Sequence, residues 1–371
     1  MNRQKTYRVL IGGGGTGGHV FPALAIADTL KQKEPGMEFL FVGARGRLEM
    51  EKVPRAGYRI VGLPVSGFQR KWSWRNFTFF VRLLVSMIRS HRIVSRFRPH
   101  VAVGVGGYAS GPILRAAARK GVPILIQEQN SYAGVTNRML ARSAETICVA
   151  YEHMDRYFPS GRIVVTGNPV RRELMRLSGD RRENLKTFQL KEEMQVCLVM
   201  GGSLGARTIN ESIMGGLDRL VKSGLQVIWQ CGSRYFPEAE KRVSESGTDQ
   251  VRVYAFISEM DRAYGAADLI VSRAGAITIS ELCLVGKPVI LVPSPNVAED
   301  HQTRNAEALV SRNAALMVPD RLAREELVDR MVKLVRDEKQ KNELIKNIRQ
   351  LGISDASERI ADEVIKIIKE S

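Results

Sequence analysis

The chain has 371 residues, which is more than one hydrophobic core usually contains and suits two domains of ordinary size. Hydrophobic residues make up 44% and charged residues 26% of the sequence, proportions that exclude an intrinsically disordered protein. The net charge is +17, and fourteen basic residues but no acidic residue lie between Lys52 and Gln127. This region should attract the phosphates of a nucleic acid, an anionic lipid or a diphosphate substrate, unless it is only a solvated basic surface.

The start of the chain, MNRQKTYRVLIGGGG, lacks the apolar region and cleavage site of a secretory signal. No window contains the roughly 18 uncharged apolar residues that are needed to cross a bilayer. The four cysteines are scattered, with no CxxC pair and no histidine at ligand spacing. We therefore expect a cytoplasmic protein with reduced, buried thiols and with neither a disulfide nor a metal site.

In chain order, residues 8–11 form a short apolar strand that leads into the glycine-rich segment GGGGTGGHVFPALAIADTL. Apolar residues at helical spacing follow, and then a second strand at residues 37–43, so the chain opens as a βαβ unit. Further strands are predicted at residues 100–108, 122–130 and 162–167. Short apolar strands that alternate with helices predict a parallel sheet covered on both faces.

The pattern restarts in the second half with a strand at residues 195–200, a tight loop at residues 201–203 and a helix from Ala206. More strands are predicted in the segments LQVIWQCG, VRVYAF, ADLIVSRAG and PVILVPSP. The second half therefore loosely repeats the first, as strand, glycine loop and helix.

The segment GNPVR is the best boundary between the two halves, because it follows a strand and contains a turn-forming Asn-Pro pair. Residues 354–371 predict a helix that packs against the first domain. One face of this helix carries Ile360, Val364, Ile367 and Ile368. The predicted domains are thus residues 1–167 with 352–371, and residues 168–351.

Gly13, Gly15 and Gly18 form a GxGxxG motif directly after the first strand and at the start of a helix. Backbone N–H groups and the helix dipole at such a loop favour a phosphate or diphosphate. The second strand ends in Val-Gly-Ala, without the acidic residue that would bind the ribose of NAD, so an NAD-dependent enzyme is disfavoured. His19 follows the glycines as a possible base, although it could also be a loop histidine that only bonds backbone groups.

Polar residues follow the strands of the second half, where α/β sheets bind ligands. Ser203 supplies a hydroxyl and Arg171 a guanidinium for a diphosphate. Glu281 could bridge two ribose hydroxyls or could cap its helix instead. Motifs such as Asp-x-Asp or HExxH are missing from the sequence, so we expect no metal and no cofactor. A diphosphate leaving group would then be stabilised by helix dipoles, backbone N–H groups, Ser and Arg.

Residues 67–89 combine aromatic and apolar side chains with arginine and lysine, and Arg82 interrupts the apolar run. A basic, tryptophan-containing amphipathic segment favours contact with anionic lipid, although a core helix with exposed arginines would give a similar pattern. The candidate membrane residues are Trp72, Trp74, Phe77, Phe79 and Phe80.

Seven ordered motifs together resemble the MurG family of bacterial glycosyltransferases over nearly the whole chain. These motifs are GGGGTGGHVFPALAIA, GVGGYASGP, EQN followed by Asn137, GNPVR, GGSLGAR, SRAGAITISEL and HQTRNA. The resemblance implies a GT-B fold, in which two Rossmann-like parallel-sheet domains are separated by a cleft. It also implies a metal-free inverting enzyme of peptidoglycan synthesis that transfers GlcNAc from UDP-GlcNAc to the C4 hydroxyl of MurNAc in lipid I, giving lipid II.

The resemblance also implies where the substrates bind. The donor would contact Arg171, Ser203, Ile257, Ala276, Ile277, Thr278, Glu281, His301 and Gln302 of the second domain. The acceptor side would be lined by Gly14, Gly15, Thr16, His19, Tyr108, Glu128, Asn130 and Asn137 of the first. Donor contacts are further assigned to Thr16, Gly17, Gly18 and Asn130. His19 is the first candidate for the general base and Glu128 the second.

The implied location is the cytoplasmic face of the inner membrane, with an anionic lipid surface and no nucleic acid as partner. Two positions depart from the family pattern, because Gln127 stands where a histidine commonly precedes EQN, and His301 where some members have Gln. Two alternatives remain open. One is another lipid-modifying GT-B transferase, such as a diacylglycerol galactosyltransferase. The other is a non-catalytic module that binds membranes or nucleic acid through its basic face.

Overall fold

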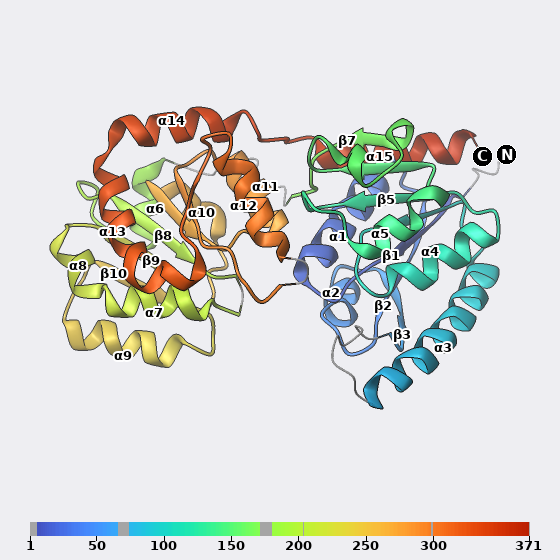
Figure 1. The fold of residues 1–371 in the computed structure, drawn as a ribbon, viewed down its shortest axis with the longest axis horizontal. Helices are drawn as coiled ribbons and strands as arrows, with labels where there is room; N and C mark the ends of the chain where they lie inside the picture. Colours follow the sequence, from blue (N-terminus) through green and yellow to red (C-terminus); the bar gives the residue numbers. More distant parts are fainter. Residues whose placement is uncertain (1–5, 66–73, 171–179, 203, 298–299, 371) are drawn as a thin grey trace. The chain divides into compact units, whose positions relative to one another are not determined.

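The computed structural model describes residues 6–65, 74–170, 180–202, 204–297 and 300–370, except for the side chains of residues 74–78 and 80. The chain divides into two compact units (Figure 1). The first unit comprises residues 1–170 and 355–371, and the second comprises residues 171–354. Each unit is an α/β domain built on its own parallel sheet.

The described strands of the first unit form a seven-stranded sheet in the order β3-β2-β1-β4-β5-β6-β7. The strands are β1 (Arg8–Gly12), β2 (Glu38–Ala44), β3 (Arg59–Leu63), β4 (Val101–Gly104), β5 (Ile124–Glu128), β6 (Thr146–Val149) and β7 (Ile163–Val165). The helices are α1 (Gly17–Lys33), α2 (Glu49–Arg55), α3 (Trp74–Phe97), α4 (Ser110–Arg119), α5 (Val135–Leu140) and α15 (Ala356–Glu370). The central strands β1, β4 and β5 are almost wholly buried, as continuous apolar runs predict.

Two hydrophobic clusters cover the two faces of this sheet. One cluster joins the sheet to α1, α2 and α15, and the other joins it to α3, α4 and α5. The predicted apolar face of α15 is confirmed, because Ile360, Val364, Ile367 and Ile368 all belong to the first cluster.

The described strands of the second unit form a six-stranded sheet in the order β10-β9-β8-β11-β12-β13. The strands are β8 (Val196–Met200), β9 (Gln226–Gln230), β10 (Val251–Tyr254), β11 (Leu269–Ser272), β12 (Val289–Leu291) and β13 (Leu316–Met317). The helices are α6 (Arg181–Thr187), α7 (Arg207–Gly215), α8 (Leu217–Lys222), α9 (Phe236–Ser246), α10 (Met260–Ala266), α11 (Ala276–Val285), α12 (His301–Val310), α13 (Ala323–Arg336) and α14 (Glu338–Arg349). Again, one hydrophobic cluster lies on each face of the sheet.

Both sheets contain a point where the strand order reverses. In the first unit the reversal lies between β1 and β4, and in the second between β8 and β11. Loops at the carboxyl ends of strands beside such a reversal form the usual ligand crevice of α/β sheets. The predicted glycine loops after β1 and β8 lie at these two points.

Candidate functional site

The loops that follow β1 and β4 pack against each other at the strand reversal of the first unit. A Cβ atom added to Gly107 would lie 2.1 Å from the carbonyl oxygen of Gly14, and one added to Gly13 would lie 2.2 Å from Cγ2 of Val105. Gly14 and Gly107 also have positive φ angles, +137° and +84°. A larger residue would therefore separate the two loops.

The four residues Thr16, Gly17, Gly18 and His19 lie where α1 begins, at the carboxyl end of β1. The half-buried His19 places Nδ1 3.0 Å from the Thr16 hydroxyl oxygen. Its ring also approaches the second loop, because a Cβ atom on Gly106 would be 2.9 Å from Cδ2 and 3.0 Å from Nε2. His19 thus contacts a side-chain hydroxyl as well as backbone, at a helix end that disfavours a protonated imidazole.

Glu128 ends β5 and is buried, with 1% of its surface exposed. One carboxylate oxygen accepts hydrogen bonds from the Asn130 N–H (3.0 Å) and side-chain amide (3.2 Å). The other accepts from the Gly134 N–H (3.0 Å) and the Asn137 side-chain amide (2.9 Å). Burial raises the pKa of Glu128, and these hydrogen bonds oppose the rise. Glu128 therefore joins the loop that carries Asn130 to α5, which carries Asn137.

A buried amide network lies beside Glu128. Gln127 donates a hydrogen bond to the Asn168 side-chain oxygen (2.9 Å), and Asn168 donates to the Gln129 carbonyl (3.0 Å). Gln129 in turn donates to the Val105 carbonyl (2.7 Å) in the loop after β4. Gln127, which departs from the family pattern, thus has a packing role. Sequence reasoning did not single out Gln129 or Asn168, although both lie in quoted motifs.

Sequence reasoning also missed Glu49, whose carboxylate accepts the Gly15 N–H at 2.8 Å. The only sequence signal was an acidic residue shortly after the second strand of a βαβ unit. Tyr108, predicted on the acceptor side, is 55% exposed directly after the glycine pair that contacts the β1 loop.

In the second unit, the loop after β8 packs against the end of β9. A Cβ atom on Gly205 would lie 1.9 Å from the Cys231 carbonyl oxygen, and one on Gly201 would lie 2.4 Å from the Ala206 nitrogen. The close approach fixes this glycine loop just before α7 begins. The predicted diphosphate residues Ser203 and Arg171 lie outside the described residues.

The start of α11 lies at the carboxyl end of β11, beside the strand reversal. Ala276, Ile277 and Thr278 form its first turn and are partly exposed, whereas Glu281 is 5% exposed one turn later. Arg273, just before this helix, donates to the Val292 carbonyl at 3.0 Å and pairs with Asp320. Those contacts hold the loops after β11 and β12 together.

Two side chains of α12 bond the loops that follow β12 and β11. Gln302 accepts a hydrogen bond from the Ser294 N–H at 2.8 Å. The buried Asn305 donates to the Ala274 carbonyl at 3.4 Å. Partly exposed His301 and Gln302 thus begin a helix that is bonded to the loop before α11.

Ile257 lies in the loop after β10, with its side chain buried beside the exposed Phe256. Its N–H is donated to the side-chain oxygen of Gln230 at 2.9 Å, at the end of β9. The Ile257 N–H is therefore engaged within the protein.

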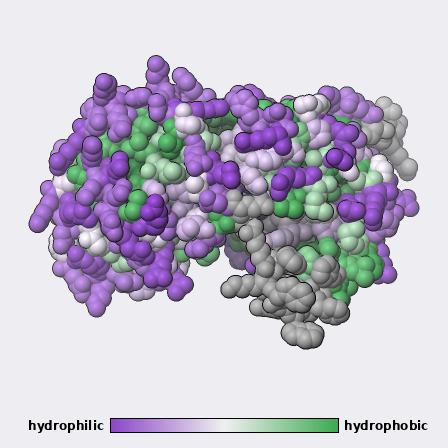
Figure 2. Space-filling model, in the orientation of Figure 1, coloured by the Kyte–Doolittle hydropathy of each residue, from purple (hydrophilic) through white to green (hydrophobic). Residues whose placement is uncertain are grey.

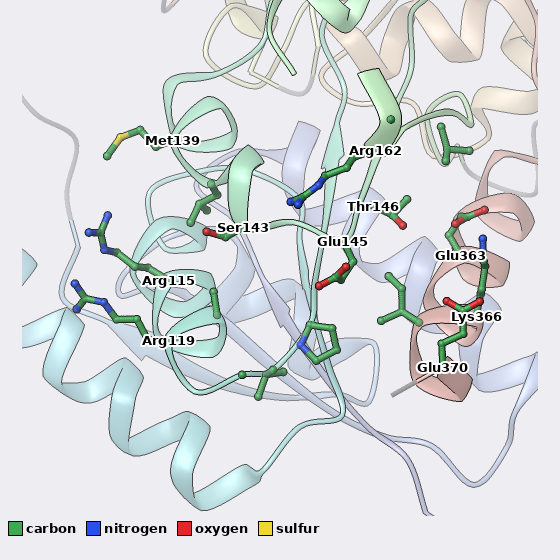
Figure 3. Close-up of a pocket in the computed structure, with 18 residues that line it drawn as sticks. Arg115, Arg119, Met139, Ser143, Glu145, Thr146, Arg162, Glu363, Lys366 and Glu370 are labelled. Atoms are coloured by element: carbon green, nitrogen blue, oxygen red, sulfur yellow. The ribbon is translucent and has the colours of Figure 1, made fainter. Parts of the chain in front are cut away.

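The first unit also contains a large cavity of about 1130 Å³, shown in Figure 3. Its walls include Glu145 and Thr146 at the start of β6, Arg162 just before β7, and Glu363 and Lys366 of α15. This cavity lies at the amino ends of the parallel strands, the end opposite to that at which such sheets usually bind ligands. It is therefore separate from the loops described above.

A smaller, apolar cavity of about 430 Å³ lies among α3, α4 and α5. Phe79, Leu83 and Met87 of α3 line one side, and Tyr108 and Arg115 lie on others. Elsewhere on these helices, Val81, Leu84 and Ile88 of α3 and Val135 of α5 are exposed, and so is Met139, which lines the cavity. Figure 2 shows hydrophobic atoms gathered over the region of α3, at the lower right.

Of the predicted membrane residues, only Phe79 is described with its side chain, and it lines this cavity. Trp72 lies outside the described residues, as do the side chains of Trp74, Phe77 and Phe80. Within the part of the chain that the structure describes, no helix is both long and apolar enough to cross a membrane.

Two family models match the chain on either side of the boundary between the units. The N-terminal domain of glycosyltransferase family 28 matches residues 9–149, and the C-terminal domain matches residues 196–360. The chain belongs to glycosyltransferase family 28.

Several relatives that match over nearly their full length carry the name UDP-N-acetylglucosamine–N-acetylmuramyl-(pentapeptide) pyrophosphoryl-undecaprenol N-acetylglucosamine transferase. The Parabacteroides distasonis protein is 54% identical over 98% of this chain and 99% of its own length. The Phocaeicola vulgatus protein is 52% identical over 98% of this chain and 97% of its own length. The crystal structure of Acinetobacter baumannii MurG aligns with a TM-score of 0.80 at 28% identity, over 97% of this chain and 99% of that one. The expected GT-B fold class and the resemblance to the MurG family are thus confirmed.

Proposed function

We propose that this family 28 protein transfers N-acetylglucosamine from UDP-GlcNAc to the MurNAc sugar of lipid I and so forms lipid II. The observation that supports the proposal most is the shared name of relatives about half identical over nearly the full length of both chains. The two strand reversals, each with a glycine loop, fit one site for a nucleotide diphosphate and one for a lipid-linked diphosphate.

The second unit supplies the donor contacts in this proposal. The carbonyl of Ile257 accepts from uracil, and the Glu281 carboxylate accepts from the ribose hydroxyls. The backbone N–H groups at the start of α11 face the diphosphate, where the helix dipole favours negative charge. Thr278, His301 and Gln302 contact the sugar, and Arg171 and Ser203 complete the diphosphate site.

The first unit supplies the acceptor contacts and the base. The acceptor C4 oxygen attacks the anomeric carbon, the bond from that carbon to the UDP oxygen breaks, and the configuration inverts. We assign the proton of the hydroxyl to His19, whose imidazole lies at the start of α1 beside the Thr16 hydroxyl. Glu128 is the weaker candidate, because both of its oxygens already accept hydrogen bonds within the β5 loop.

Titration calorimetry with UDP-GlcNAc, UDP-galactose and NADH, in the presence of EDTA, tests the donor. We expect selective binding of UDP-GlcNAc. A preference for UDP-galactose would indicate a glycolipid galactosyltransferase instead. Binding of neither sugar nucleotide would contradict the proposal. Glu281→Ala should weaken UDP binding, by about tenfold or more if a hydrogen-bonded carboxylate is lost. Unchanged UDP affinity in this variant would contradict the ribose assignment.

The acceptor is carried by a lipid, and we propose that the enzyme works at the cytoplasmic face of the inner membrane without crossing it. The exposed Val81, Leu84 and Ile88 lie on one face of α3, within the region that lacks acidic residues. An apolar helix face in a basic region suits the interface of an anionic membrane.

Flotation with vesicles that contain anionic phospholipid tests the membrane contact. The triple change of Val81, Leu84 and Ile88 to serine should lower the bound fraction several-fold, because three apolar side chains no longer enter the interface. Leu204→Ser is the matched control, since Leu204 is 84% exposed in the second unit. Equal flotation of both variants would contradict the assignment of α3.

A further inference from the structure

Glu49 begins α2 and lies beneath the glycine loop of the first unit, with 1% of its surface exposed. One carboxylate oxygen accepts the Gly15 N–H at 2.8 Å, and the other accepts the Ala44 N–H at 2.8 Å. The side chain therefore joins the loop after β1 to the end of β2, and both oxygens are used by backbone donors.

The backbone around Glu49 leaves room for this side chain only because two neighbours are glycines. A Cβ atom on Gly14 would lie 2.2 Å from a Glu49 carboxylate oxygen, and one on Gly43 would lie 2.4 Å from its Cγ. Real Cβ atoms do not come so close to other atoms. A residue larger than glycine at either position would therefore displace the Glu49 carboxylate. Gly14, Gly43 and Glu49 thus form one fitted unit.

The carboxylate accepts a backbone N–H of the kind that binds a ligand in other proteins of this architecture. In glycine loops that follow the first strand of a Rossmann-like domain, backbone N–H groups bind the phosphates of the ligand. An acidic residue after the second strand instead binds ribose hydroxyls. Here β2 ends without such a residue, and Glu49, five residues beyond Ala44, instead accepts the N–H of Gly15.

We propose that Glu49 is a positioning residue that acts as a built-in anion of the acceptor loop. It fixes the loop conformation and reserves the Gly15 N–H. The acceptor diphosphate is therefore confined to the start of α1, at Gly17 and Gly18, and not at Gly14 and Gly15 as the family resemblance implied. A second anion at Gly15 would be repelled by the negative charge of the Glu49 carboxylate. The inference rests on the proposed function, in which the first unit binds a lipid-linked diphosphate.

Glutamine cannot replace Glu49 in this role, although it has almost the same shape. A carboxamide offers one oxygen, and its NH₂ group would face a backbone N–H donor. Glu49→Gln should therefore lower kcat/KM for the lipid-linked acceptor by roughly tenfold to a hundredfold, the range for loss of one hydrogen bond to a charged group. The effect should appear mainly in the acceptor KM, because the acceptor binds the displaced loop.

The experiment compares Glu49→Gln, Glu49→Ala and the control Glu51→Gln by steady-state kinetics with a lipid I analogue and UDP-GlcNAc. Glu51 lies on the same helix and pairs with Arg55 at 3.1 Å on the surface. The control should match the wild type. UDP affinity, measured by calorimetry, should be unchanged in all variants. Sodium formate should partly restore the acceptor KM of Glu49→Ala, because a small carboxylate can accept the two orphaned N–H groups, and sodium chloride should not.

An unchanged acceptor KM in Glu49→Gln would overturn the inference, as would failure of formate to restore Glu49→Ala. Failure of both variants to fold would also overturn it, because Glu49 would then support the whole domain rather than position one loop. A wild-type enzyme that does not transfer GlcNAc would instead contradict the proposed function, so the two failures are distinguishable.

Discussion

His19 lies just beyond the carboxyl end of β1, and Glu128 is the last residue of β5, yet their polar atoms have different surroundings. His19 is half-buried and places Nδ1 beside a hydroxyl oxygen, at a helix end that favours the neutral imidazole. Glu128 is buried, and four donors surround its two oxygens. A general base must reach the proton that it accepts. The contacts therefore favour His19 as the base and Glu128 as a residue that shapes the loop.

For His19→Ala we expect kcat to fall by about 10²–10⁴-fold, the usual cost of losing a general base. The UDP affinity of the variant should stay unchanged. His91→Ala, an exposed position on α3, is the control and should keep wild-type turnover. If His19→Ala keeps near-wild-type kcat, His19 is not the base.

For Glu128→Gln we expect a stability loss of about 1–3 kcal/mol, because the amide nitrogen cannot accept the hydrogen bonds that the lost oxygen accepted. Urea unfolding of the variant measures this loss. A kcat reduction as large as that of His19→Ala, without any loss of stability, would show that Glu128 takes part in the proton transfer instead.

At the residue scale, a functional role could be predicted from the sequence only for residues that lie in a recognisable motif. His19, Glu128 and Glu281 were chosen in this way, and their catalytic and binding roles remain predictions. Glu49 and Asn168 were missed because their roles depend on tertiary contacts. Glu49 lies 34 residues from the glycine whose N–H it accepts, and Asn168 lies 41 residues from Gln127. Neither separation leaves a periodic signal in one sequence.

At the element scale, most of the described strands could be predicted from short apolar runs next to turn residues, and three could not. The strands β1, β4 and β8 are apolar runs that lead into glycine loops, and their prediction is confirmed, as is that of β5, which ends in Gln127 and Glu128. The strands β3, β6 and β13 were not predicted. Exposed and half-buried residues interrupt the apolar pattern of β3, whereas β13 has two residues and β6 is a four-residue strand that begins with Thr146.

The helices α7 and α13 are joined on the surface by Glu211, which accepts from Arg207 (2.7 Å) and Arg324 (2.7 Å). These two arginines lower the pKa of Glu211. Because the folded pKa lies below the unfolded one, the contribution to stability is present above about pH 4.5 and is lost as the pH falls through the folded pKa.

For Glu211→Gln we therefore expect a loss of about 0.5–1 kcal/mol at pH 7, the upper part of the range for exposed ion pairs, and a smaller difference at pH 3. Chemical denaturation at both pH values measures it. The exposed Glu325→Gln on α13 is the control. A difference that stays constant between the two pH values would contradict the ion-pair explanation.

At the scale of the whole molecule, α15 belongs to the unit that is distant from it in sequence. Ile360 is fully buried in the cluster that joins α15 to α1 and the first sheet. For Ile360→Ala we expect the first unit to lose about 2–5 kcal/mol, as for other large-to-small changes in a core. The second unit should keep its stability, because its hydrophobic clusters do not include α15.

Thermal unfolding monitored together with UDP binding tests this prediction. The variant should lose transferase activity at a lower temperature than it loses UDP affinity, because the donor contacts lie mostly in the second unit. Simultaneous loss of both properties at the lower temperature would show that the two units unfold as one cooperative block.

The placement of α15 also sets the order in which the two units can complete their folding during synthesis on the ribosome. Domains of a growing chain usually complete their folding from the N-terminus onwards. Here the core of the first unit stays open along α1 until residues 356–370 have been translated, which is after every strand of the second unit. The unit that is made first is thus completed last, and the apolar face that α15 covers stays exposed while the second unit is synthesised.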